Sequence, residues 1–265
     1  GDQTKIVEYV KSINEQRERD LAAKSFNLLV YGGMGSGKTH LLRTARRPIF
    51  VYSLDPGGWK TNRDLVDGST FMVDANCEKE DPFNPTVWEY FDKKYHEMKK
   101  VGFFNLLGTL CIDSLTTLAQ GALNWVMKKD KRAGGTPYQQ DWLPQMALLE
   151  NVIKDLTSLP CDTIVTAHPD MDKDEATGRM FVGPMVTGKL KTRLPLLFDE
   201  IYYADAKQGA NKTEYFLITQ KDGLFIARSR LGTGGRFLQK EEPNIKNLLK
   251  KAGMNYDDKP GIKFE

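Results

Sequence analysis

Hydrophobic residues in this chain form short continuous runs that alternate with stretches of helical periodicity. Runs of strand length occupy residues 28–31, 49–53, 70–73 and 162–167. Between them, apolar side chains recur at helical spacing, most clearly over residues 86–100. Strands that alternate with helices predict an α/β fold, with a mainly parallel central sheet that is flanked by helices.

The pattern changes in the last third of the chain. Residues 200–204, 214–219 and 224–228 are predicted strands, and the sequence Lys-Asp-Gly at 221–223 predicts a hairpin between the last two. We expect these strands to be antiparallel and to lie at one edge of the sheet. Residues 169–189 show no sustained period and predict a long irregular segment, which in a compact domain is usually functional or mobile.

Both ends of the chain carry predicted helices outside this pattern. Residues 3–24 form a mildly amphipathic helix that we expect to pack on the edge of the domain, although a dedicated partner contact is an alternative. Residues 245–252 form a short basic helix before a polar tail. The expected division is an N-terminal helix at 1–25, one core domain at 26–240, and a C-terminal helix and tail at 241–265.

Composition narrows the class of protein without indicating a ligand. The net charge is +3 over 265 residues, which does not by itself indicate nucleic-acid binding. The 3 cysteines, Cys77, Cys111 and Cys161, have no metal-ligand spacing and fit a reducing compartment. No apolar run approaches membrane-spanning length, and the charged N-terminal segment does not resemble a secretory signal. We therefore expect a soluble intracellular protein without a membrane partner.

The first apolar run leads directly into a glycine-rich loop. Residues 32–39 read G-x-x-x-x-G-K-T, and the order of strand, glycine loop and helix is the context in which this motif binds phosphates. Backbone N–H groups and the helix N-terminus attract the phosphate oxygens. Lys38 is expected to reach the β and γ phosphates, and Thr39 to ligate Mg²⁺. The expected nucleotide-binding residues are Gly32, Gly33, Met34, Gly35, Ser36, Gly37, Lys38, Thr39 and His40.

A second strand supplies an acid for the same site. An apolar strand within residues 106–118 ends at Asp113, and the carboxyl ends of parallel strands meet at one edge of a sheet. We expect Asp113 to face the Mg²⁺ held by Thr39, usually through water. The alternative is an aspartate that only caps the following helix. Asp55 and His168 also follow predicted strands and are expected at this edge.

The order of these motifs resembles the RecA-type ATPase core over about residues 26–232. Within that group the chain is most similar to the short phage-encoded RecA-like proteins, an AAA-type nucleotide-binding family linked to single-strand annealing. The matching features are an acid-Pro-Gly turn at 55–57, T-A-H at 166–168, L-F-D-E-I at 197–201 and R-S-R at 228–230. The resemblance implies a RecA-like P-loop fold that uses ATP and Mg²⁺.

The resemblance also implies roles for individual side chains. Asp55 would position or activate the attacking water, a role that RecA gives to a glutamate, and His168 would couple the γ-phosphate to the segment that follows it. Arg228 and Arg230 would bring positive charge to a phosphate, as a finger across a subunit boundary. The implied catalytic set is Lys38, Asp55, Asp113, His168 and Arg230. A packed strand-end histidine and arginines on a solvated strand remain the alternatives.

RecA-like proteins place two DNA-binding loops where this chain has residues 128–138 and 169–189. Basic side chains there could neutralise phosphates, and an aromatic ring such as Phe181 could stack on a base. The implied DNA-binding residues are Lys128, Lys129, Lys131, Arg132, Tyr138 and Lys189. Acidic residues within 170–175 argue against the second loop, and an ordinary solvated loop is the alternative for both.

The expected function is therefore a DNA-stimulated P-loop ATPase that binds single-stranded DNA and promotes annealing or strand exchange in phage recombination. The resemblance implies a homo-oligomeric ring or filament in the cytoplasm of a phage-infected bacterial cell, with a single-stranded-DNA-binding protein as a further partner. A packaging or helicase-type motor, a small-molecule kinase, and a nucleotide-gated binding module with little turnover are the alternatives. The binding module remains an alternative because the Asp55 side chain is one methylene shorter than that of a glutamate, so hydrolysis could be slow.

Overall fold

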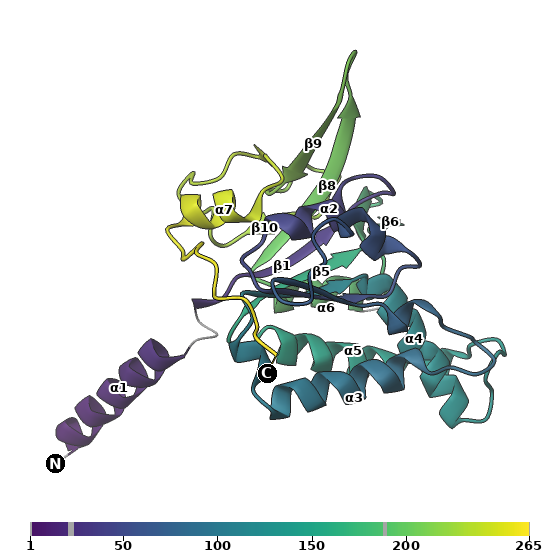
Figure 1. The fold of residues 1–265 in the computed structure, drawn as a ribbon, viewed down its shortest axis with the longest axis horizontal. Helices are drawn as coiled ribbons and strands as arrows, with labels where there is room; N and C mark the ends of the chain where they lie inside the picture. The colour runs from purple at the N-terminus through teal and green to yellow at the C-terminus, as the bar shows by residue number, and fades with distance from the viewer. Residues whose placement is uncertain (1, 21–23, 188–189, 265) are drawn as a thin grey trace.

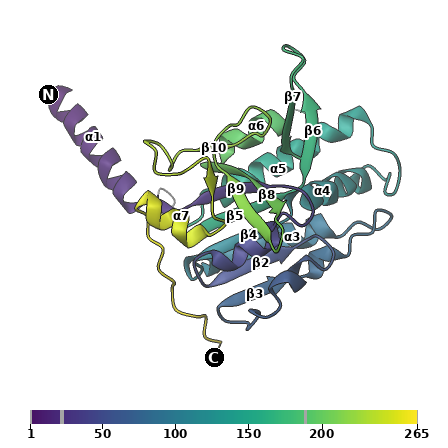
Figure 2. The same ribbon diagram turned by 90° about the horizontal axis from the view of Figure 1, so that it is seen from above.

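One mainly parallel sheet runs through the computed structural model, which describes residues 2–20, 24–187 and 190–264, apart from the side chain of Thr192. The sheet runs through the middle of the molecule (Figure 1). Its strand order is β11-β9-β8-β1-β5-β4-β2-β3, with β10 paired to β8, and Figure 2 labels most of these strands. The mutually parallel strands are β1 (Asn27–Tyr31), β2 (Ile49–Ser53), β3 (Phe71–Asp74), β4 (Thr109–Asp113), β5 (Asp162–Ala167) and β8 (Glu200–Gln208). The antiparallel additions are β9 (Thr213–Ile218), β10 (Arg228–Ser229) and β11 (Lys240–Glu241).

Helices cover both faces of this sheet, lying above and below it in Figure 1. One face carries α3 (Val87–Lys100), α4 (Leu115–Lys129), α5 (Trp142–Leu156) and α6 (Leu190–Leu197). The other carries α2 (Lys38–Leu41) and α7 (Ile245–Ala252). Short 3-10 turns are η2 (Leu42–Thr44), η3 (Gly58–Asn62), η4 (Asn76–Glu78), η5 (Phe103–Asn105) and η6 (Gln139–Asp141). The α/β fold class predicted from the sequence is confirmed, including the antiparallel strands at one edge.

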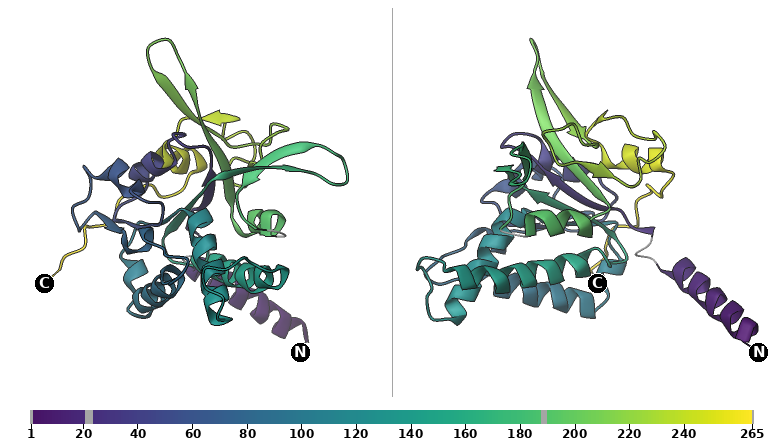
Figure 3. Two further views of the ribbon diagram at one scale, coloured as in Figure 1. Left: turned by 90° about the vertical axis from the view of Figure 1, so that its right-hand side faces the viewer. Right: turned by 180° about the vertical axis from the view of Figure 1, so that it is seen from behind.

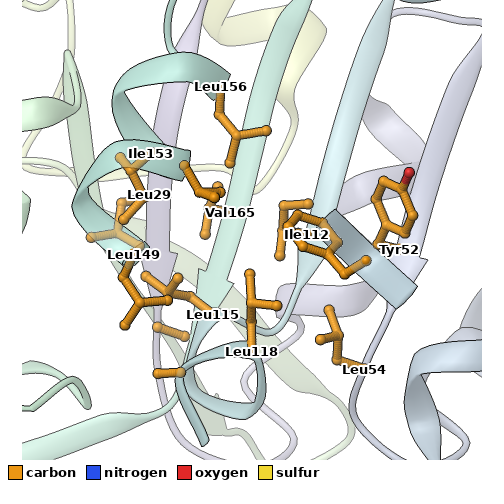
Figure 4. Packing of buried hydrophobic residues seen from close by; sticks show 14 of the residues in the cluster. Leu29, Tyr52, Leu54, Ile112, Leu115, Leu118, Leu149, Ile153, Leu156 and Val165 are labelled. Carbon is orange, nitrogen blue, oxygen red and sulfur yellow. The ribbon is translucent and has the colours of Figure 1, made fainter. Parts of the chain in front are cut away.

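Side chains of each central strand alternate between two hydrophobic clusters. Leu29 of β1 packs on the side of α4 and α5, whereas Leu28 packs on the side of α2 and α7. Figure 4 shows Leu29 and Val165 against Leu149 and Ile153 of α5. A strand that is buried on both faces reads as a continuous apolar run, which is why these strands could be recognised. This packing fixes the sheet edge on which the polar residues lie.

The segment expected to be irregular forms a hairpin, so that prediction is wrong. Strands β6 (Pro169–Lys173) and β7 (Met180–Pro184) pair antiparallel as a separate two-stranded sheet. Figure 3 shows this hairpin projecting from the body in a different direction from the β8–β9 hairpin. Much of it is exposed, with Met171 at 62% and Met180 at 44%. Without one consistently buried face, the strands carry no alternating hydrophobic pattern.

The predicted hairpin between residues 214–219 and 224–228 is also wrong. The hairpin is formed by β8 and β9, one strand earlier. After the Lys-Asp-Gly turn, residues 224–226 bond to β7 instead: the Val182 N–H donates to the Leu224 carbonyl at 2.8 Å. The Asp222 carboxylate accepts N–H bonds from Leu224 and Phe225, which directs the chain away from β9.

The two terminal helices behave differently from each other. Helix α7 has the predicted bounds and buries Ile245, Leu248 and Leu249. Helix α1 (Asp2–Arg19) buries no residue and stands away from the body (Figure 1), so the edge packing expected of it is not found. Within the described ranges, no helix is long and apolar enough to cross a membrane.

Candidate nucleotide site

The carboxyl ends of β1, β2, β4 and β5 lie side by side, because these strands are parallel neighbours in the sheet. Their ends are joined by backbone hydrogen bonds. The Leu54 N–H donates to the Asp113 carbonyl at 2.6 Å, and the Gly32 N–H donates to the Ala167 carbonyl at 3.3 Å. The structure thus brings the predicted loop, Asp55, Asp113 and His168 to one edge of the sheet.

Close backbone approach explains two glycines of the phosphate loop. A Cβ atom on Gly32 would lie 2.2 Å from the carbonyl oxygen of Ala204 in β8. Gly37 has a φ of 88° at the start of α2, a left-handed conformation that favours glycine. Helix α2 is one turn long and continues as the 3-10 turn η2 to Thr44. The short helix still directs the N-terminal end of α2 toward the loop.

Lys38 is buried inside the loop that it is expected to serve. Its Nζ donates to the carbonyl oxygens of Gly32 at 2.7 Å and Gly33 at 2.9 Å. Burial lowers the pKa of Lys38, and the carboxylates of Asp113 and Asp55 oppose that shift. The Lys38 ammonium also donates to Ser36 Oγ at 3.5 Å, and a buried ammonium held by neutral oxygens can exchange those partners for phosphate oxygens.

Asp113 ends β4 and is only 2% exposed. Its Oδ2 accepts a hydrogen bond from Thr39 Oγ1 at 2.8 Å, and its Oδ1 accepts one from Thr166 Oγ1. Burial raises the pKa of Asp113, whereas the hydrogen bonds from Thr166 and Thr39 lower it. Asp113 does not cap the next helix, because the N-cap of α4 is Ser114, whose Oγ accepts from the Thr117 N–H.

The Thr39 hydroxyl and the Asp113 carboxylate together suit a magnesium ion. Both are oxygen ligands of the kind Mg²⁺ takes, and their hydrogen bond holds them side by side at the phosphate loop. Among the described residues, no group of three or more His, Cys, Asp or Glu forms a metal site. The set therefore fits an ion that arrives with phosphates and keeps several waters, rather than one held in a protein cage.

Asp55 and His168 form a contact that the sequence did not predict. His168 Nε2 lies 2.9 Å from Asp55 Oδ2, and the other carboxylate oxygen accepts hydrogen bonds from Ser114 Oγ at 2.7 Å and from Thr117 Oγ1. The His168 backbone N–H donates to Thr116 Oγ1 at 3.0 Å. Asp55, which was expected to activate water, and His168, which was expected to relay the state of the γ-phosphate, are therefore hydrogen-bonded to each other.

Glu78 holds the turn that carries Asp55. Its carboxylate accepts from Ser53 Oγ at 2.6 Å and from the Gly57 N–H at 2.8 Å. Glu78 lies on η4, far along the chain from the other site residues, and no sequence signal distinguishes it. Thr166 could have been found, since it belongs to the T-A-H motif that already singled out His168.

A cavity of about 650 Å³ opens beside the phosphate loop. Loop and α2 residues, including His40, line part of the cavity. Further lining residues come from distant parts of the chain, among them Tyr215 of β9 and the segment Glu242, Pro243 and Asn244 before α7. Sequence reasoning missed these distant residues, because no local motif links them to the phosphate loop.

The two arginines of the late strand have different surroundings. Arg228 donates to the carbonyl oxygens of Pro195 and Phe198 at the end of α6, and burial lowers its pKa. Arg230 is paired with Asp199 at 2.7 Å, and its side chain is 55% exposed. Arg230 is therefore the more exposed of the two and is held by Asp199, while Arg228 is engaged in holding α6.

Several cationic side chains of the predicted first DNA loop are engaged within the protein. Lys128 Nζ donates to the Pro85 carbonyl at 2.8 Å, and Arg132 pairs with Asp141 and Asp130 and lies 4.5 Å from the Tyr138 ring centre. Lys129 lies over the Trp125 ring at 4.9 Å, and Lys131 is exposed. Lys189, expected in the second loop, lies outside the described residues. The charge available to a polyanion is therefore smaller than the sequence predicts.

Three solved structures show a weak overall similarity to this chain at low sequence identity. A KaiC-like protein from Pyrococcus horikoshii OT3 has 13% identity and a TM-score of 0.40, covering 72% of this chain and 77% of its own. An ATPase of the type III secretion system of pathogenic bacteria has 15% identity and a TM-score of 0.43, with 69% and 55% covered. The flagellar accessory protein FlaH from Methanocaldococcus jannaschii has 12% identity and a TM-score of 0.42, with 85% and 88% covered.

Sequence comparison gives one further result. No curated protein sequence matches the chain significantly. Residues 24–231 match a protein family described as an AAA domain. The matched span includes the phosphate loop, Asp55, Asp113 and His168.

Proposed function

Because the chain belongs to the AAA domain family of P-loop ATPases, we propose that it couples ATP hydrolysis to the binding of single-stranded DNA. In this proposal it acts like RecA, and promotes annealing or strand exchange in phage recombination. The observation that carries the proposal is the continuous chain of contacts from the phosphate loop through Asp113, Asp55 and His168 to the β6–β7 hairpin.

The hydrolytic step is proposed to use Asp55 to position the attacking water. An ionised carboxylate offers about four lone-pair sites, and Ser114, Thr117 and His168 occupy three of them. One site is left for a water molecule. Lys38 would leave the loop carbonyls for the β and γ phosphates, and bound Mg²⁺ would supply charge stabilisation at Thr39 and Asp113.

The link to DNA is proposed to run through His168. This residue follows β5 directly and precedes β6, so the hairpin starts where the imidazole contacts Asp55. The other end of the hairpin is anchored at the same point, because the Met185 N–H donates to the His168 carbonyl at 2.7 Å and Thr116 Oγ1 donates to the Met185 carbonyl at 3.1 Å. A shift of His168 on nucleotide binding would therefore move both strands of the hairpin.

Steady-state ATP hydrolysis with and without a single-stranded oligonucleotide tests this coupling. We expect the oligonucleotide to change the rate in the wild type. The double variant Lys129→Glu/Lys131→Glu should lose most of that response and keep its basal rate. Lys93→Glu, an exposed charge reversal on α3, is the matched control. If single-stranded DNA neither binds nor changes hydrolysis in the wild type, the DNA part of the proposal is wrong and the ATPase assignment stands separately.

The proposed assembly is a homo-oligomeric ring or filament with ATP near a subunit boundary. Arg230 supports this, since its exposed guanidinium is held in place by Asp199 and could reach a phosphate in a neighbouring subunit. A single-stranded-DNA-binding protein would be a further partner in the cytoplasm of the infected cell. Particle size measured with and without ATP tests the assembly, and a monomer under both conditions would contradict it.

A nucleotide-gated binding module with little turnover is the second candidate function. The observation in its favour is that the Asp55 carboxylate already accepts hydrogen bonds from Ser114, Thr117 and His168. Only one position is then left for the attacking water. A single-turnover experiment with enzyme in excess distinguishes the two. Hydrolysis that is as slow as in the Asp55→Asn variant would favour the binding module.

A further inference from the structure

We propose that the Tyr215 ring is the platform on which the base of the bound nucleotide stacks, in the cavity beside the phosphate loop. This inference rests on the proposed nucleotide site and assigns the part of the ligand that the phosphate loop cannot hold. The expected ligand is a nucleoside triphosphate, whose aromatic base would stack on the Tyr215 ring. The ring projects from β9, is 45% exposed, and packs against Gly37 at the start of α2.

The position of the cavity sets where the base must go. Residues 35–41 line one end, and the phosphates belong there because the loop N–H groups and Lys38 lie there. The same cavity continues to Tyr215 and to the segment 242–244. A volume of about 650 Å³ lies in the range typical of small-molecule sites. A triphosphate bound at the loop would therefore extend its ribose and base toward Tyr215.

Tyr215 lies directly against the phosphate loop. Its Cδ1 is 3.1 Å, and its Cε1 3.6 Å, from the position that a Cβ would take on Gly37. A Cβ on Gly37 would make the ring shift by a few tenths of an ångström, so glycine suits this contact. The ring therefore packs directly beside the site where the phosphates are expected to bind.

One face of the ring is available to a ligand. Tyr215 is 45% exposed, and its cross-strand partner on β8 is the small residue Ala206. None of the ring–ring or cation–ring contacts among the described residues involves Tyr215, whereas the neighbouring Phe216 is covered by the Lys240 ammonium at 4.5 Å. A large aromatic side chain in a cavity without an intramolecular partner is suited to stack on a base.

Other lining residues surround the same space. His40 lines the cavity from α2, and Pro243 contributes an apolar ring from the segment before α7. Stacking is tolerant of base identity, since every base has a π-face, so we expect ATP and GTP to bind with affinities within about tenfold of each other.

Equilibrium binding of ATP and of inorganic tripolyphosphate, both with Mg²⁺, tests the assignment on the full chain. Tripolyphosphate carries the phosphates without a base. We expect Tyr215→Ala to raise the dissociation constant for ATP about tenfold or more. The dissociation constant for tripolyphosphate should stay within about twofold of the wild-type value. Tyr215→Phe keeps the ring and should bind both ligands like the wild type.

Three results would overturn the proposal. If Tyr215→Ala binds ATP normally, the base lies elsewhere. If Tyr215→Ala weakens the binding of ATP and of tripolyphosphate equally, the ring shapes the phosphate loop and does not contact the base. If the wild type binds tripolyphosphate but gains nothing from the base of ATP, the base site is absent while the phosphate loop works. Failure of the wild type to bind either ligand would instead remove the phosphate site itself, and the base site with it.

Discussion

At the scale of single residues, Asp55 after β2 and His168 after β5 are hydrogen-bonded to each other. Asp55 is held by hydroxyls of Ser114 and Thr117 from α4 and its N-cap, and by His168 at the start of the hairpin. Removing one member leaves a partly buried polar group without its partner, which costs more than the net worth of the bond. The arrangement therefore fixes the direction of the carboxylate before any nucleotide is bound.

Asp55→Asn should slow single-turnover hydrolysis about 10²–10⁴-fold, which is the usual worth of a positioned acid–base group. Nucleotide affinity should change little, because the phosphate loop is untouched. Rapid-quench measurement of ADP formation tests this, with Asp92→Asn on α3, whose side chain is 46% exposed, as the control. His168→Gln keeps a donor for Asp55 and should lose less activity than His168→Ala. An unchanged rate in Asp55→Asn would remove this residue from the hydrolytic step.

The cysteines provide a test of burial at the same scale. Cys77, Cys111 and Cys161 are each 0% exposed, and burial raises the pKa of Cys77 and of Cys161 from 9.0 to about 12. A colorimetric thiol reagent at mildly alkaline pH should therefore react with none of them in the native protein and with all 3 after denaturation. Rapid reaction of the folded protein would contradict the packing.

The raised pKa values of two of these thiols also predict how the free energy of unfolding changes with pH. In the unfolded chain a thiol loses its proton near its ordinary pKa of 9.0, whereas Cys77 and Cys161 keep theirs to about 12 when folded. The unfolded state then binds fewer protons than the folded state, so this contribution to stability falls as pH rises from about 9 to about 12. Denaturant unfolding at increasing pH measures the slope, and a rise in stability over that interval would have the wrong sign.

Which residues could be predicted depended on whether their partners were local. Lys38 and Thr39 belong to a compact motif, and Asp113 ends a strand whose apolar run is continuous, so both signals lie within a few residues. The Asp55–His168 contact and the role of Glu78 depend on the register between neighbouring strands and on the path of a loop. Tyr215 reaches the site only because β9 folds back on β8.

At the scale of secondary structure, buried elements followed the sequence pattern and exposed ones did not. Strands β2 and β5 and helix α7 have the bounds expected from their hydrophobic residues. The β6–β7 hairpin lacks one fully buried face, and its charged residues Asp170 and Asp172 are paired with Lys191 of α6. Such tertiary ion pairs leave no periodicity in the sequence, so this element was missed.

Helix α1 and helix α5 offer a matched comparison of exposed and buried isoleucines. Ile13 in α1 is 42% exposed, whereas Ile153 in α5 is fully buried. Ile153→Ala should lower the free energy of unfolding by about 2–5 kcal/mol through lost burial and the cavity left behind. Ile13→Ala should change it by less than about 0.5 kcal/mol. Denaturant unfolding measures both, and equal losses would mean that α1 packs on the body.

At the scale of the whole molecule, two hairpins rise from the region of the nucleotide site (Figure 3). The β8–β9 hairpin carries Tyr215 beside the phosphate loop, and the β6–β7 hairpin begins after His168. Under the two proposals above, each hairpin would contact a different part of a bound nucleotide, the base in one case and the γ-phosphate in the other. This arrangement could convert the state of the nucleotide into movement of two surfaces.

The central claim is that ATP is hydrolysed at the phosphate loop, and steady-state hydrolysis by the wild type and by Lys38→Ala tests it most directly. Lys38 makes its contacts inside the loop, so its loss should leave the fold intact, as the circular dichroism spectrum and the thermal midpoint can show. We predict Mg²⁺-dependent turnover by the wild type and a loss of at least about a hundredfold in the variant. Equal hydrolysis by a folded Lys38→Ala protein would contradict the account.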